Sequence, residues 1–229
     1  METQDCFLLS YLKYGDNDAI LNCLGKESGF FTAFARGIYA SKNKKKAYLF
    51  PLNQLNITFV NGRKSSNLPN VSKSERVVLD YDFNDVKVNT ILFFIADFLN
   101  QVVKEETFSS KIYFETEQFL VELLAENFSS YIGFIFKILS LQGISPLYEN
   151  LNYLNPETGN FESEKSHLFF DEEISKIWKN YLTNEKVYQI QLNRTVRKKV
   201  LDSLMIYYSI HFSGFFEPKS LEIIQQIFD

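Results

Sequence analysis

Residues 29–46 have the sequence GFFTAFARGIYASKNKKK, a predicted strand that leads into a basic loop. Phe30, Thr32 and Phe34 alternate with the residues between them, as expected of a half-buried strand that Gly37 then ends. The loop holds clustered cations and no acidic residue, and these cations are Arg36, Lys42, Lys44, Lys45 and Lys46. A strand that fixes such a cluster in space suits a polyanion, and a solvated lysine-rich turn is the alternative.

Short strands are also predicted on both sides of this stretch. They cover residues 7–12, 19–24 and 55–60, with a weaker fifth strand over 64–71. Turn signals separate them at residues 14–17 and at Asn61-Gly62, the latter typical of a hairpin. Five short strands within about 70 residues favour a small closed barrel over a sandwich.

From about residue 85 the apolar period changes from 2 to 3.6, which predicts helices. They are expected near 85–102, 116–126, 129–141, from Asp171, over 194–212 and over 218–228, with an irregular segment at 144–169. The predicted fold class is therefore α+β, with an N-terminal barrel domain at 1–80 and an all-α bundle domain at 81–229.

The charge is divided between these two parts. The whole chain has a formal net charge of −4, which alone argues against a nucleic-acid partner. Residues 1–80, however, carry 11 Lys and Arg against 7 Asp and Glu, while the remainder carries 13 against 21. This charge asymmetry predicts that the N-terminal domain binds an anionic partner.

No catalytic or metal-binding motif is recognisable. Neither of the glycine-rich nucleotide-binding motifs occurs, and the only cysteines and histidines are Cys6, Cys23, His167 and His211. Their spacing does not suit a structural zinc site, and we expect both cysteines and His211 to be core residues. The start lacks the features of a signal peptide and the apolar runs are too short for a membrane span, so we expect a cytoplasmic binding protein without cofactor or membrane contact.

A second basic cluster opens the long C-terminal helix, and it comprises Arg194, Arg197, Lys198 and Lys199. A solvated first turn is one interpretation, but cations at a helix N-terminus oppose the helix dipole, which weakens that interpretation and leaves a functional anion contact as the alternative. Leu201 and Met205 follow within one to two turns.

Several motifs follow one another in a familiar order. Residues 14–16 have the sequence Tyr-Gly-Asp. The basic lysines at 42–46 are preceded by Gly29, Ala35 and Gly37 and followed by Pro51. The tail has the sequence YYSIHFSGFFEPKSLEIIQQIF. In this order they resemble the RecO family of bacterial recombination mediators, over nearly the whole chain. Many members carry a four-cysteine zinc module after a helix that ends in Gly-x-x-Pro. Here Gly-Ile-Ser-Pro at 143–146 leads into a segment without cysteine, which resembles the zinc-less version of Bacteroidetes-like lineages.

The resemblance implies a non-enzymatic protein with an N-terminal OB-fold and a C-terminal helical domain. Such a protein binds single- and double-stranded DNA, anneals complementary strands, and works with RecR to load RecA onto DNA coated by single-stranded DNA-binding protein (SSB), in the nucleoid. The runner-up is an OB-fold adaptor that binds only protein, and a nuclease comes third.

Three expectations follow for particular residues. The DNA-binding residues are the cations of residues 36–46, with Tyr39 and Tyr48 as stacking platforms. The C-terminal basic cluster, with Leu201 and Met205, binds the acidic C-terminal tail of SSB, with DNA or RecR as alternative partners. In place of a metal, residues 144–169 are held by packing of Leu147, Tyr148, Leu151, Tyr153, Leu154 and Phe161.

Overall fold

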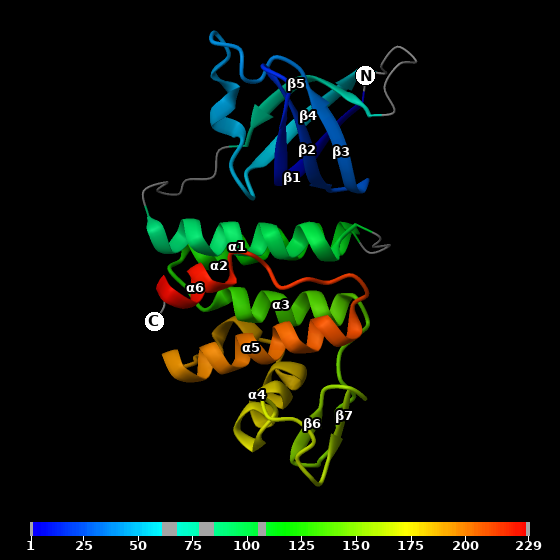
Figure 1. The fold of residues 1–229 in the computed structure, drawn as a ribbon, viewed down its shortest axis with the longest axis vertical. Coiled ribbons are helices and arrows are strands. Elements are labelled where there is room, and N and C mark those ends of the chain that lie inside the picture. The colour runs from blue at the N-terminus through cyan, green and yellow to red at the C-terminus, as the bar shows by residue number, and fades with distance from the viewer. Residues whose placement is uncertain (1, 61–67, 78–84, 105–108, 228–229) are drawn as a thin grey trace. The chain divides into compact units, whose positions relative to one another are not determined.

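The computed structural model describes residues 2–60, 68–77, 85–104 and 109–227 (Figure 1). Two compact units divide the chain, the first covering Met1–Phe114 and the second Glu115–Asp229. Among the described residues, no helix has the length and apolar character needed to cross a membrane.

The first unit contains the predicted closed barrel (Figure 1). Its strands are β1 (Glu2–Tyr14), β2 (Asp18–Gly25), β3 (Gly29–Ala35), β4 (Gln54–Val60) and β5 (Asn70–Arg76), in the order β1-β2-β3-β5-β4. All neighbours pair antiparallel except β3 and β5, which are parallel. A five-stranded barrel of this kind, followed by helices, confirms the predicted fold class.

Small side chains fill much of the barrel interior. Cys6, Cys23 and Ala33 are fully buried there beside Leu8 and Ile57, which suits the narrow inside of a small barrel. A hydrogen bond to Cys23 and burial raise the pKa of the Cys6 thiol. Both cysteines are free and buried, so they are small core residues as predicted.

The fifth strand differs from its prediction. It lies at Asn70–Arg76, whereas the prediction covered 64–71. Residues 64–67 of that prediction and the predicted hairpin turn at 61–62 lie outside the described residues. The sequence NVSKSER contains one apolar residue, Val71, so it carries no clear strand pattern. Pairing with the strongly patterned β4 makes it a strand.

Helix α1 (Val86–Val102) lies entirely within the first unit. The Asp85 carboxylate caps it by accepting hydrogen bonds from the backbone N–H groups of Lys87 and Val88. The helix contacts β1, where the Ser10 hydroxyl donates a 3.0 Å hydrogen bond to Asn100 Oδ1. Helix α2 (Ser109–Leu124), which begins earlier than predicted, contributes Tyr113, whose ring lies 4.7 Å from that of Phe7.

The second unit is built from helices (Figure 1). These are the remainder of α2, then α3 (Ser130–Leu141), α4 (Glu172–Thr183), α5 (Arg194–His211) and α6 (Leu221–Ile227), with a short 3-10 helix η2 (Val187–Gln189). Helix α3 is buried on nearly every side, as its apolar sequence predicts. Its Gly133 lets η2 approach closely, because a Cβ there would lie 3.2 Å from Val187 O.

Residues 144–169 are more regular than predicted, since they form a small hairpin of β6 (Tyr153–Asn155) and β7 (Asn160–Glu162). Leu154 and Phe161 are fully buried as expected. The expectation was wrong for Leu147, Tyr148 and Leu151, which remain 68%, 56% and 40% exposed.

Polar contacts hold the segment where those apolar residues do not. Leu154 N donates to Ser175 Oγ at 2.9 Å, and Tyr207 OH donates to Ile144 O at 3.0 Å. His211 Nε2 lies 2.6 Å from Pro156 O and its ring stacks on Tyr207. His211 therefore has the structural role predicted for it.

We expect metal chelation to leave the thermal stability unchanged. Within the described ranges, no group of three or more His, Cys, Asp and Glu side chains could hold a metal ion. The measurement is the melting temperature with and without EDTA, together with elemental analysis. Stoichiometric zinc, or a melting temperature that falls with chelator, would contradict this expectation.

Candidate nucleic-acid interface

The basic loop, defined as residues 36–48, is ordered by hydrogen bonds of its own. It begins with turns and ends in a 3-10 helix, η1 (Lys44–Tyr48). Asn43 organises it, because its Oδ1 accepts from Lys45 N at 2.9 Å while its Nδ2 donates to Gly37 O at 2.8 Å. The amide thus caps the helix and closes the loop.

The barrel anchors this loop at both ends. Ile38 and Leu49 are buried in the barrel core. Gly37, at a φ of +62°, donates its N–H to Asp18 Oδ1 at 2.7 Å, and Tyr39 N donates to Asn17 O at 2.8 Å. The cations are consequently held at a fixed place beside the β1–β2 turn.

All the predicted loop cations reach solvent. Arg36, Lys42, Lys44 and Lys46 are exposed and Lys45 is half-buried. No acidic side chain lies within the loop to offset them. Such a cluster attracts a polyanion, and the attraction falls with added salt.

Two ammonium groups lie near the ring of Tyr39. Lys13 Nζ is 5.7 Å and Lys46 Nζ is 5.8 Å from the centre of its ring, within reach of cation–π attraction. Desolvation and the neighbouring Tyr11 raise the pKa of Tyr39, so the phenol stays neutral at physiological pH. Tyr48 is half-buried and packs against the barrel core.

Beyond the loop, the outer face of β1–β3 presents a second cluster, which the sequence did not reveal. Tyr14 and Phe34 meet edge to face with ring centres 5.6 Å apart, and the Arg36 guanidinium lies 6.0 Å from the Phe34 ring centre. Leu12 precedes them on β1 and is 63% exposed. The loop therefore adjoins an exposed apolar and aromatic surface.

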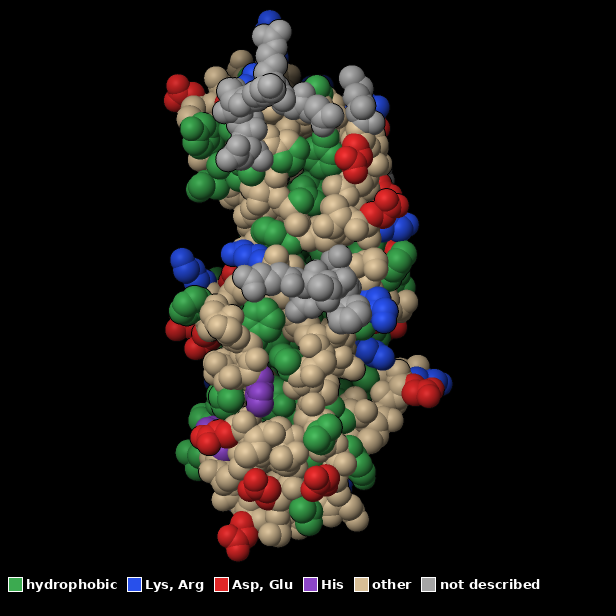
Figure 2. All heavy atoms as spheres, turned by 90° about the vertical axis from the view of Figure 1, so that its right-hand side faces the viewer, with side chains coloured by type: hydrophobic (Ala, Val, Ile, Leu, Met, Phe, Trp, Pro, Cys, Tyr) green, Lys and Arg blue, Asp and Glu red, His purple; other side chains and the backbone are tan. Residues whose placement is uncertain are grey.

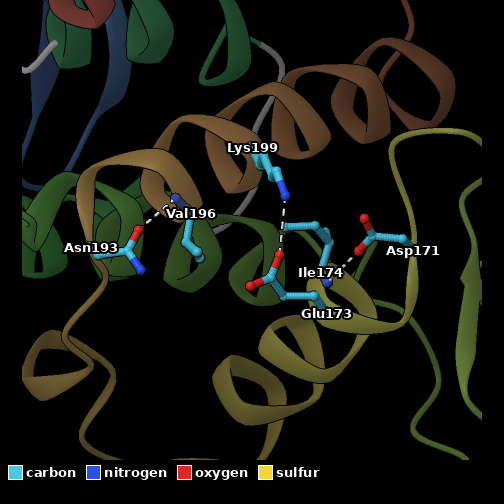
Figure 3. A network of polar contacts seen from close by, with 6 residues as sticks. All are labelled: Asp171, Glu173, Ile174, Asn193, Val196 and Lys199. Carbon is cyan, nitrogen blue, oxygen red and sulfur yellow. Dashed lines mark hydrogen bonds and ion pairs between the residues drawn. The ribbon is translucent and has the colours of Figure 1, made fainter.

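The C-terminal basic cluster is divided by the structure. Lys199 Nζ forms a 3.1 Å ion pair with Glu173 Oε2 of α4 (Figure 3). Arg197 Nη1 instead donates to Ser129 Oγ at 3.3 Å. The Asn193 side chain caps α5 by accepting from Val196 N. Of the predicted cations, Arg194, Lys198 and Lys199 line one open hollow of about 530 Å³, and Arg197 does not line it.

An adjoining hollow of about 370 Å³ shares Asp202 with the first. Its apolar lining residues are Phe169, Met205, Ile206, Phe215 and Leu221, and Ser209 and Glu217 join Asp202 as its polar ones. Met205 therefore lies near the cations as predicted, whereas Leu201 is 1% exposed and lies in the core. Phe169, Phe215 and Leu221 were missed because they come from segments far apart in the sequence.

Figure 2 shows one face of the molecule with its charged and hydrophobic side chains coloured. On the face drawn in Figure 2, acidic side chains are dispersed over the second unit and form no dense patch. Hydrophobic side chains reach that surface at several separate places. A hollow that gathers three cations therefore contrasts with the net negative charge of residues 81–229.

Comparison with known proteins gives a consistent result. Residues 1–78 match the family model "Recombination protein O N terminal" and so cover the barrel and the basic loop. The chain is 28% identical to the DNA repair protein RecO of Flavobacterium psychrophilum and to that of Christiangramia forsetii, and 25% identical to that of Flavobacterium johnsoniae. Each comparison covers 96% of this chain and 96% of the relative.

Proposed function

Because the chain belongs to the RecO family of DNA repair proteins, we propose that it is a recombination mediator that binds and anneals single-stranded DNA. It acts without catalysing a reaction and without a cofactor, in the cytoplasm and at the nucleoid. With RecR it loads RecA onto DNA that SSB covers. The similarity to RecO proteins along the chain supports these roles.

The observation that carries DNA binding is the anchored basic loop. Its exposed cations Arg36, Lys42, Lys44 and Lys46 stand at fixed positions on the barrel, with the Tyr39 ring among them. Phosphate contacts of this kind position a strand without reading its sequence. The same contacts serve single and double strands, because both present phosphates.

Annealing follows from the same charges. Two complementary strands repel each other through their phosphates, and cations that neutralise one strand's backbone lower this repulsion. Contacts to phosphates leave the Watson–Crick edges of the bases free to pair. A protein that holds strands by the backbone therefore favours duplex formation.

Annealing of complementary oligonucleotides coated with cognate SSB tests this function. The protein is expected to accelerate duplex formation over SSB-coated strands alone, measured by quenching between end labels. If the protein binds neither single strands nor duplex and leaves annealing unchanged, the proposal is wrong and an adaptor that binds only protein becomes the better account.

We further propose that the two hollows along α5 bind the acidic C-terminal tail of SSB. Bacterial versions of that tail end in acidic residues followed by a phenylalanine. Arg194, Lys198 and Lys199 would hold the carboxylates, and the neighbouring apolar hollow around Met205 would receive the ring. The shared side chain of Asp202 marks the boundary between the two.

Titration of a tail peptide against the full chain tests this second site. Reversal of Arg194 and Lys198 to glutamate is expected to weaken binding about tenfold or more, since two charge pairs become repulsive. The control reverses Lys165 and Lys186, two exposed lysines of the same unit outside both hollows. Binding that survives the Arg194 and Lys198 changes would place the tail elsewhere.

A further inference from the structure

We infer that Glu173 is a specificity-determining residue of the proposed tail site, where it competes with the acidic ligand for Lys199. All the residues that line the cation-rich hollow belong to α5, whereas Glu173 lies in the first turn of α4. This inference rests on the proposed tail site and adds a regulation of it, because the strength of the site then depends on a carboxylate of the protein itself.

The Lys199 ammonium group is directed toward α4. Its Nζ lies 3.1 Å from Glu173 Oε2, and the two side chains point toward each other (Figure 3). Lys199 lines the hollow, but Glu173 is not among the lining residues. The ion pair therefore draws one of the three lining cations to a carboxylate outside the hollow, while Arg194 and Lys198 are the other two.

The starts of both helices are secured by other residues. Asp171 Oδ1 caps α4 by accepting a hydrogen bond from Ile174 N at 2.9 Å, and Asn193 Oδ1 caps α5 by accepting one from Val196 N, also at 2.9 Å (Figure 3). Neither cap uses the Glu173 carboxylate. That carboxylate can therefore exchange its partner while both helix starts stay capped.

The exposure of the ion pair makes it replaceable by a ligand. The side chains of Lys199 and Glu173 are 47% and 54% exposed. Exposed ion pairs contribute little, because water screens the charges and two long side chains lose freedom when they pair. A ligand carboxylate can consequently replace Glu173 at Lys199, and the replacement costs about fivefold in affinity or less.

This competition favours a ligand that carries several adjacent acidic groups. A ligand with one carboxylate held by Arg194 and Lys198 gains nothing from Lys199, which already has a partner. A further ligand carboxylate reaches Lys199 by replacing Glu173. Asp202 also lines the hollow and repels acidic groups on its side, so several ligand charges are needed to outweigh the protein's own two carboxylates.

Removal of the Glu173 charge is expected to strengthen binding of the acidic tail peptide to the full chain. Glu173→Gln keeps the size of the side chain and is expected to raise the affinity about threefold to fivefold, because Lys199 then needs no displacement. The control Glu172→Gln removes the same charge from the same exposed turn of α4 and is expected to change the affinity less than about twofold. Isothermal titration calorimetry measures both.

Two further measurements show whether the gain depends on Lys199. Lys199→Ala is expected to cost the wild type about twofold or less and to cancel the gain when combined with Glu173→Gln. A peptide in which all but one acidic side chain is replaced by its amide is expected to bind Glu173→Gln and wild type within about twofold of each other, because it does not reach Lys199.

The outcomes separate this inference from the tail site on which it rests. Equal effects of Glu172→Gln and Glu173→Gln, a gain that survives Lys199→Ala, or an equal gain for both peptides would overturn the competition while the tail site stands. Absence of peptide binding to the wild type, or binding that survives reversal of Arg194 and Lys198, would overturn the tail site and the inference with it.

Discussion

Charge reversal of four loop lysines is expected to abolish binding of single-stranded DNA at moderate salt. The replaced residues are Lys42, Lys44, Lys45 and Lys46, which the Asn43 cap and the barrel anchors hold together. Removal of four phosphate contacts, with repulsion in their place, should lower the affinity by at least about 100-fold. Anisotropy of a labelled oligonucleotide at constant ionic strength measures the loss.

The control variant must change the net charge of the protein by the same amount as the loop variant does. Replacement of Lys104, Lys165, Lys186 and Lys219 by glutamate reverses four exposed lysines outside the loop. This variant is expected to retain at least most of the affinity, because its changes lie outside the basic loop. If both variants lose affinity equally, whole-chain charge governs binding; if neither loses any, the loop lysines are merely solvated.

Trp178→Ala is expected to destabilise the second unit by about 3–5 kcal/mol, out of a total of about 5–15 kcal/mol for a typical domain. The indole is fully buried, and its ring centre lies 4.8 Å from Phe136, 5.7 Å from Phe170 and 4.9 Å from Tyr207. Truncation would leave a cavity that neighbours from several segments cannot all close. Urea unfolding followed by far-UV circular dichroism measures the change, because the variant lacks the only tryptophan.

Trp178→Phe separates packing from hydrogen bonding. Trp178 Nε1 donates to Ser203 Oγ at 2.8 Å, and Ser203 Oγ itself donates to Val200 O at 2.7 Å. Phenylalanine keeps most of the buried ring and leaves the second hydrogen bond intact, so a loss of only about 1–2 kcal/mol is expected. Equal losses in the two variants would show that the hydrogen bond outweighs the packing.

Elements with strong apolar periodicity were predictable from the sequence. In α1 the predicted face residues, from Val88 to Val102, are all buried, and the nearly uniform burial of α3 follows from its composition. Strand β5 was misplaced because its residues carry little pattern and its pairing partner decides its state. The 144–169 segment was misjudged for a related reason, since Ser175 and Tyr207, which hold it, lie far along the chain.

The cations of the basic loop were visible in the sequence as a cluster without acid. Their anchoring was not visible, because it depends on Asn43 and Asp18 reaching the backbone of Gly37. Lys13 and Tyr14 were missed because the pairing of β1 with β2 shifts between Leu8 and Ser10, as at a β-bulge. Strict alternation from the buried Leu8 would place the Tyr14 side chain inside the barrel. One inserted residue exchanges the inner and outer sides for every later residue of the strand.

The salt dependence of wild-type affinity for a short single strand tests the central claim most directly. Release of counterions from about five phosphates predicts that the logarithm of the association constant falls with the logarithm of salt concentration at a slope of roughly −3 to −4. A slope near zero, or no binding at low salt, would contradict the account that the anchored basic loop binds the phosphate backbone.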